Sequence, residues 1–209
     1  MRRVFASDAL GPDEADQIRA ALEAGFLLIY PTDTLYAVGG LVLRADAAAR
    51  VRAAKGREEA KPLPAVAADV EQVRRLCGRL VGPALAAAEA FWPGPLTLVL
   101  PARADVPEAV TSGSATIAVR VPDRALTRAL CRLAGPLIST SANRAGSAPA
   151  LTSDEAVAAV GPSVAWVIDA GPGKPVPSTI VDATGLEPRL LRAGAIPWDR
   201  VSRLWLAAE

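Results

Sequence analysis

Residues 26–34 of the chain are Phe26-Leu-Leu-Ile-Tyr-Pro-Thr-Asp-Thr34. The uninterrupted apolar run at 26–30 predicts a strand that is buried on both faces, as in a parallel or mixed sheet covered by helices. Pro31 ends this strand, and a polar turn follows at residues 32–34. Because ligands of open α/β sheets bind at the carboxyl ends of strands, we expect a site at this turn. The segment therefore predicts an α/β fold and the place of a site.

Helices and strands alternate along the rest of the chain. A helix begins at Gly11-Pro12-Asp13, where proline and acidic residues favour the first turn, and ends at Gly25. Apolar periodicity, capping residues and proline breaks predict the other elements. The helices cover 46–54, 69–77 and 123–134 and also begin at Pro83 and at Thr152, where Glu155 completes a capping box with Thr152. The strands cover 63–68, 96–100, 117–121, 137–138, 164–168, 178–182 and 189–192, and the last two pair around a Thr184-Gly185 turn. No repeat and no linker-like change of composition is present, which indicates one domain.

The composition excludes several kinds of active site. The 209 residues contain no histidine, which removes Ser-His-Asp and Cys-His catalysis, histidine metal ligands and an imidazole base. Cys77 and Cys131 lie far apart, each in a predicted helix, which indicates reduced core cysteines. The net charge of +1 predicts no strong nonspecific attraction to nucleic acid, so an anion site requires local clustering.

Targeting and membrane signals are lacking in the sequence. No apolar run reaches the roughly 18 residues that a membrane helix needs, and the N-terminus has no apolar signal region. We therefore expect a cytoplasmic protein with no membrane partner.

A cationic loop follows the second predicted helix: Lys55-Gly-Arg-Glu-Glu-Ala-Lys-Pro-Leu63. Gly56 and Pro62 punctuate the run, so Lys55, Arg57 and Lys61 belong to a shaped loop. Such a loop suits the phosphates of a nucleotide. The alternative is a solvated connection between a helix and a strand.

Hydroxyl side chains gather at the ends of three predicted strands, at residues 32–34, 139–143 and 178–179. Turn and capping chemistry explains any one cluster by itself. Together with the isolated Arg120 and Arg192 and the cationic loop, they indicate an extended basic cleft for a nucleotide and a small polar acid.

Familiar catalytic motifs are missing. Neither GxxxxGK[ST] nor GxGxxG occurs, so the chain has no P-loop or Rossmann phosphate site. Ser141 is a weak candidate nucleophile, because no histidine is available as its base and its Ser-Ala-Asn context lacks the glycines of a nucleophile elbow.

The sequence resembles the YrdC-like threonylcarbamoyladenylate synthases, which begin the synthesis of threonylcarbamoyladenosine in tRNA. Seven motifs carry the resemblance, in family order from about residue 8 to 197. They are Tyr30-Pro-Thr-Asp-Thr-Leu-Tyr-Ala-Val-Gly39, Lys55-Gly-Arg57 with Pro62-Leu63, Phe91-Trp-Pro-Gly-Pro-Leu-Thr97, Ile117-Ala-Val-Arg-Val-Pro122, Ser139-Thr-Ser-Ala-Asn143, Pro177-Ser-Thr-Ile-Val-Asp182 and Leu191-Arg-Ala-Gly194.

The resemblance implies a YrdC-like domain over residues 8–197, a twisted mixed sheet flanked by helices with a large basic cleft. Residues 198–209 would then be a C-terminal tail with a short helix, as in the short bacterial form without an extra domain. The implied reaction joins L-threonine, bicarbonate or CO2 and ATP, with Mg2+, into threonylcarbamoyl-AMP and pyrophosphate. Its implied partners are downstream tRNA threonylcarbamoyl-transferase proteins. No protein-bound transition metal is implied.

The resemblance also implies a role for individual residues. Catalysis falls to Lys55 and Arg57; ATP binding to Arg57, Lys61, Thr116, Ser141, Asn143 and Arg192; threonine binding to Thr32, Thr34, Arg120, Ser139 and Ser178.

Three positions depart from the family pattern. Val66 stands where many members carry histidine, Ala37-Val38 replaces Gly-Leu, and Glu58 replaces proline. The alternatives are a divergent paralogue and a non-catalytic module that binds tRNA or double-stranded RNA. Carbamoyl-adenylate chemistry, as in related domains of hydrogenase maturation proteins, is disfavoured because acylphosphatase and zinc-finger sequence is absent.

Overall fold

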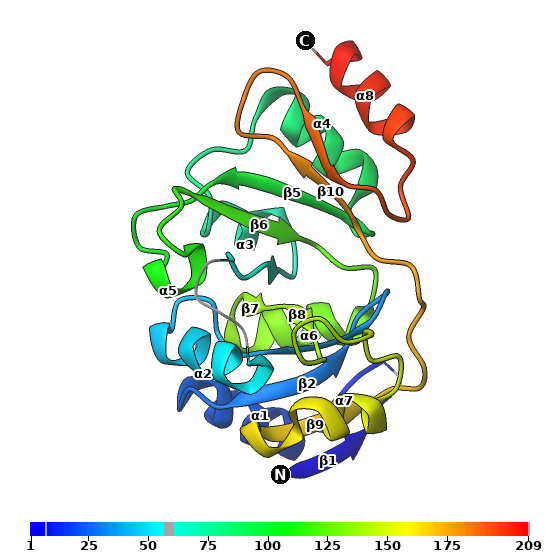
Figure 1. Cartoon of the computed structure of the whole chain (residues 1–209). Coiled ribbons are helices and arrows are strands. Elements are labelled where there is room, and N and C mark those ends of the chain that lie inside the picture. Colours follow the sequence, from blue (N-terminus) through cyan, green and yellow to red (C-terminus); the bar gives the residue numbers. More distant parts are fainter. Residues whose placement is uncertain (7, 57–60, 209) are drawn as a thin grey trace.

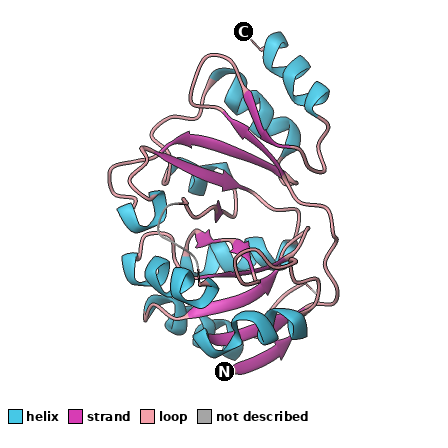
Figure 2. Cartoon of the chain, viewed as in Figure 1, coloured by secondary structure: helices cyan, strands magenta, loops and turns pink. Residues whose placement is uncertain are grey.

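A computed structural model describes residues 1–6, 8–56 and 61–208 of the chain (Figure 1). These residues form two mixed sheets with helices packed around them (Figure 2). The first sheet has the order β1 (Arg2–Phe5), β9 (Val164–Asp169), β2 (Leu27–Pro31), β3 (Tyr36–Gly39), β8 (Thr140–Ser141). The second has the order β11 (Arg189–Arg192), β10 (Thr179–Asp182), β5 (Leu96–Pro101), β6 (Thr116–Arg120), β4 (Ala65–Val66), β7 (Leu137–Ile138). The α/β prediction is confirmed, with two sheets where one was expected.

Helices connect these strands. Their bounds are α1 (Pro12–Glu23), α2 (Ala45–Lys55), α3 (Val70–Arg74), α4 (Gly82–Phe91), α5 (Glu108–Thr111), α6 (Ala125–Ala134), α7 (Ser153–Val160), the 3-10 helix η1 (Gly161–Ser163) and α8 (Trp198–Ala207). No helix in the described part of the chain is long and apolar enough to cross a membrane.

Strand β2 is buried on both faces, as its sequence predicts. Leu27 and Ile29 belong to a core cluster that includes residues of α2 and α7, whereas Leu28 and Tyr30 pack in a second cluster with residues of α1 and α6. The alternation follows from the period of two along a strand. Pro31 is the last residue of β2, opposite Tyr36 of β3, so the strand ends one residue later than predicted.

The second sheet is covered differently on its two faces. Leu96, Leu98 and Val119 point into the core cluster that also contains residues of α4 and α8. Thr97 of β5 and Ala118 and Arg120 of β6 alternate with these residues and face the other way, toward the first sheet. In Figure 1 the β5, β6 and β10 layer lies opposite the layer of β2 and β9. The two sheets therefore face each other across a space lined by residues of both.

Several local predictions are confirmed and others are corrected. The Thr152 hydroxyl accepts a hydrogen bond from the Glu155 amide at 3.2 Å, and the Glu155 carboxylate accepts from the Thr152 amide, which completes the predicted capping box. Strands β10 and β11 pair antiparallel, as expected. The helix predicted over 69–77 ends at Arg74, so Cys77 lies outside it. The backbone of Cys77 forms an isolated antiparallel β-bridge with Ala102. Cys77 and Cys131 are both free thiols and buried.

Both ends of the chain join the sheet and helix layers. Strand β1 pairs parallel with β9, so the first sheet begins before residue 8. Helix α8 packs on α4, with Val201 and Trp205 buried. The strand predicted over 63–68 is shorter in the structure and covers only Ala65–Val66.

Candidate active site

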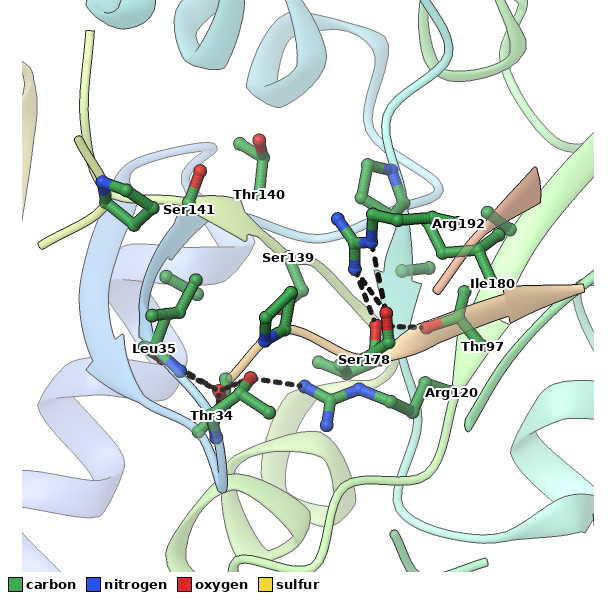
Figure 3. Close-up of a pocket in the computed structure, with 18 of the residues that line it drawn as sticks. Thr34, Leu35, Thr97, Arg120, Ser139, Thr140, Ser141, Ser178, Ile180 and Arg192 are labelled. Atoms are coloured by element: carbon green, nitrogen blue, oxygen red, sulfur yellow. Dashed lines mark hydrogen bonds between the residues drawn. The ribbon is translucent and has the colours of Figure 1, made fainter. Parts of the chain in front are cut away.

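A cavity of about 530 Å³ lies between the two sheets. Strands β3 and β8 of the first sheet and β4, β5, β6, β10 and β11 of the second contribute residues to its lining. Figure 3 shows the hydroxyl and guanidinium groups that face it. Two of the cations predicted for the cleft, Arg120 and Arg192, line this single cavity.

Strand register builds the floor of the cavity. Arg192 pairs with Ile180, Ile180 with Thr97, and Val66 with Arg120. The neighbouring pair of Leu98 and Val119 places Thr97 beside Arg120. Paired residues share a face of the sheet, so these five side chains form one row across five strands, about 4.8 Å from strand to strand. All five line the cavity.

Arg192 is held at one end of the row by Ser178. Its Nε and Nη2 donate to the Ser178 carbonyl oxygen at 3.0 and 2.8 Å, and Nη2 also donates to Ser178 Oγ at 2.9 Å. Ser178 Oγ lies 2.9 Å from Thr97 Oγ1. Burial and the nearby positive charge of Arg120 lower the pKa of Arg192. The guanidinium is thus fixed on neutral oxygen atoms (Figure 3).

The polar turn after β2 approaches Arg120 of this row from the first sheet. Thr32 Oγ1 accepts from the amides of Thr34 and Leu35, both at 3.2 Å, and donates to the Leu35 carbonyl at 2.7 Å. Thr34 Oγ1 lies 3.0 Å from Thr32 Oγ1 and 3.5 Å from Arg120 Nη2. Arg120 Nη1 donates to Asp33 Oδ1 at 2.5 Å. The two threonines and Arg120 therefore meet, as the sequence predicts for a small polar acid.

The hydroxyls of Ser139 and Ser141 complete the lining from the segment that leaves β7. The Ser139 amide donates to the Pro64 carbonyl at 2.7 Å, and Ser141 pairs with Ala37 of β3. Tyr30 donates its hydroxyl to the Ile138 carbonyl at 2.8 Å. Burial raises the pKa of Tyr30, so this phenol stays protonated and acts as a donor.

Lys55 and Asn143 lie outside the cavity lining. The Lys55 ammonium is buried and donates to the carbonyl oxygens of Ser141 and Asn143, the latter at 2.7 Å. Asn143 Nδ2 donates to the Ser147 carbonyl at 2.6 Å. These bonds shape the loop that carries Ser141. A direct catalytic role for Lys55 stays a prediction.

Two other predicted residues that the structure describes, Thr116 and Lys61, are not in the lining. Thr116 begins β6 four residues before Arg120, with Oγ1 at 3.3 Å from Ser114 Oγ. Lys61 is exposed, although Pro62 next to it lines the cavity. Arg57 and Glu58 lie outside the described residues.

Sequence reasoning missed two residues of the site. Thr97 is the polar residue between Leu96 and Leu98, which period-two alternation would have placed on the face away from the core. Asp33 sits between two selected threonines, but its partner Arg120 is 87 residues away. In the described residues no group of three His, Cys, Asp or Glu is placed to hold a metal ion.

Comparison with known proteins agrees with this geometry. A family model for Sua5/YciO/YrdC, described as "Telomere recombination", matches residues 20–194. The chain belongs to the Sua5/YciO/YrdC family. This finding confirms the resemblance drawn from the seven motifs.

Similar proteins and structures cover most of the chain. The threonylcarbamoyl-AMP synthase of Bacillus subtilis is 36% identical over 88% of this chain, which spans 54% of that protein. A threonylcarbamoyl-AMP synthase of Chromohalobacter salexigens is 37% identical, with 81% of this chain and 94% of that protein covered. The crystal structure of P. abyssi Sua5 complexed with L-threonine matches with a TM-score of 0.89 and 31% identity, over 98% of this chain and 61% of that one. The chain thus spans about half the length of some relatives and most of others.

Proposed function

We propose that the protein is an L-threonylcarbamoyladenylate synthase. It forms threonylcarbamoyl-AMP and pyrophosphate from L-threonine, bicarbonate or CO2 and ATP, and the product serves threonylcarbamoyladenosine modification of tRNA. The observation that carries this proposal is one cavity in which a hydroxyl-rich turn with Arg120 faces a second arginine, Arg192. The 31% identity to a Sua5 that is complexed with L-threonine supports the choice of amino acid.

The two ends of the cavity suit different parts of the reactants. Arg120, beside Thr32 and Thr34, provides a guanidinium for the threonine carboxylate and hydroxyls for its polar groups. Arg192 provides a cation without an acidic partner among the described residues, which suits phosphate oxygens. Ser141 lies on the opposite wall, where it can bond the nucleotide.

The proposed chemistry needs no side-chain nucleophile. The threonine ammonium first releases a proton to solvent, and the resulting amine attacks CO2. The new N–C bond forms as one C–O π bond opens, and loss of a second proton to solvent leaves the carbamate. A carbamate oxygen then attacks the α-phosphorus, and the bond from that phosphorus to the bridging oxygen breaks as pyrophosphate leaves. Such a nucleotidyl transfer depends on positioning and on charge stabilisation. Arg192 offsets the growing negative charge of the phosphates, and Arg120 holds the amino acid in line.

Magnesium enters this proposal as part of the substrate. The ion arrives bound to the ATP phosphates as MgATP. It neutralises phosphate charge in that complex. Arg57 and Lys61 of the cationic loop are assigned to the same phosphates on the family resemblance alone, and Lys55 is assigned to hold the Ser141 loop in place.

Pyrophosphate release tests the proposal. The full chain is incubated with MgATP and bicarbonate, with and without L-threonine, and the nucleotide product is identified by mass spectrometry. We expect release that requires threonine, a product with the mass of threonylcarbamoyl-AMP, and a strong loss in Arg192→Ala. Arg103→Ala is the matched control, because Arg103 pairs only with the exposed Asp105 in the described chain and lies away from the cavity lining.

A different result would favour another function. Threonine-independent hydrolysis of ATP, or no release at all, would reject the synthase. No release together with tight, salt-sensitive binding of tRNA would favour the non-catalytic module.

A further inference from the structure

Asp33 is the one acidic side chain that pairs with a cavity arginine among residues 1–6, 8–56 and 61–208. Its Oδ1 accepts from Arg120 Nη1 at 2.5 Å, and the two side chains are only 10% and 7% exposed. A buried pair of this kind is costly unless each charge stays compensated. Any ligand that approaches Arg120 therefore enters a site where the cation is already neutralised.

Arg192 has a different charge environment. Within the described chain it makes no ion pair, and its donors go to the carbonyl and hydroxyl of Ser178. The cavity thus has a neutral end, at the Arg120–Asp33 pair, and a cationic end at Arg192. The cationic end favours an anion, whereas the neutral end has no net charge to offer one.

We propose that Asp33 makes the Arg120 end of the cavity selective for a zwitterionic amino acid over a simple carboxylate. This inference rests on the proposed function and names the residue that sets the charge class of its amino-acid substrate. A ligand carboxylate at Arg120 also meets the negative charge of Asp33 nearby. The ammonium group of a zwitterion offsets that repulsion, but a ligand without it leaves two carboxylates around one guanidinium.

The backbone around Asp33 makes the idea testable. The turn is held by Thr32 Oγ1, which bonds the amides of Thr34 and Leu35 and the Leu35 carbonyl. None of these bonds uses the Asp33 carboxylate. Asp33→Asn removes the charge with nearly unchanged shape, and the bonds that define the turn are kept.

Calorimetry on the full chain compares three ligands: L-threonine, 3-hydroxybutyrate, which lacks the ammonium, and L-threoninamide, which lacks the carboxylate. For the wild type we expect threonine to bind at least about tenfold more tightly than either analogue. In Asp33→Asn the preference for threonine over 3-hydroxybutyrate should fall about tenfold, because the site then has net positive charge. Asp105→Asn, at an exposed pair with Arg103, should keep the wild-type ranking.

Two results would overturn the inference: equal binding of 3-hydroxybutyrate and threonine by the wild type, or an undiminished preference in Asp33→Asn. Two measurements check that Asp33→Asn is folded. It should unfold cooperatively on heating, and it should bind the magnesium complex of a non-hydrolysable ATP analogue as tightly as the wild type does. If Asp33→Asn fails these checks, Asp33→Ser replaces it and the wild-type ligand series still decides. Absence of threonine-dependent pyrophosphate release would reject the proposed function separately, since the ligand ranking does not depend on turnover.

Discussion

Replacing Gly39 by alanine tests how closely the two sheets must approach. A Cβ at this position would lie 1.6 Å from the Ile138 carbonyl oxygen and 2.6 Å from its carbon, far below the 3.0 Å that real Cβ atoms keep. The contact is to backbone, so no side chain can rotate away. Strands β3 and β7 would have to separate by about 1.4 Å to restore 3.0 Å.

Separating β3 from β7 should lower the free energy of unfolding. The same Ile138 oxygen accepts the hydrogen bond of the buried Tyr30 hydroxyl, and the Ile138 amide donates to Gly40 at 2.8 Å. Overpacking costs about 1–3 kcal/mol, and loss of a buried hydrogen bond adds about 1 kcal/mol. We expect Gly39→Ala to lower the free energy of unfolding by about 3 kcal/mol. For a chain of this size that corresponds to a fall in Tm of roughly 6–12 °C.

Urea denaturation followed by tryptophan fluorescence measures the change, with Gly78→Ala as the matched control. A Cβ at Gly78 meets nothing within 4 Å, so this variant should unfold at nearly the wild-type urea concentration. Because Ser139 follows Ile138 directly and lines the cavity, the KM for threonine should rise in Gly39→Ala. A Gly39→Ala variant as stable as Gly78→Ala would refute the account of the sheet contact.

Two further predictions concern charge. Arg192→Lys should raise the KM for ATP about tenfold and leave the KM for threonine nearly unchanged, because a lysine ammonium cannot reproduce the forked donation to Ser178. Steady-state kinetics with each substrate varied measures both KM values. A KM for ATP equal to that of the wild type would contradict this role of Arg192. For Asp169, burial opposes ionisation, but hydrogen bonds led by that from Ser153 Oγ at 2.6 Å outweigh it and lower the pKa. A lowered folded-state pKa contributes stability that is present above the unfolded pKa and is lost as pH falls through the folded one. Ser153→Ala should therefore raise the pKa of Asp169, which carboxyl NMR measures. It should also reduce the free energy of unfolding at pH values above the unfolded-state pKa. An unchanged pKa of Asp169 in this variant would contradict the role assigned to Ser153.

Local sequence was enough to predict the elements whose causes are local. The apolar run at 26–30, the capping pair Thr152 and Glu155, and the strands around Thr184-Gly185 were all correctly placed. Helix length was less reliable: the helix predicted over 69–77 ends at Arg74 because the chain turns there to bring Cys77 beside Ala102. Such tertiary contacts override helical propensity.

Periodicity and capping act over a few residues, so the alternation of helices and strands and the polar character of the strand ends could be predicted from local sequence. Which of those polar groups meet depends on the fold. Arg192, Thr97 and Arg120 become members of one row through the register of strands that lie far apart in the chain. The pairing of Asp33 with Arg120 is equally non-local. Register is set by long-range pairing of whole strands, and no local pattern around any one of these residues contains it.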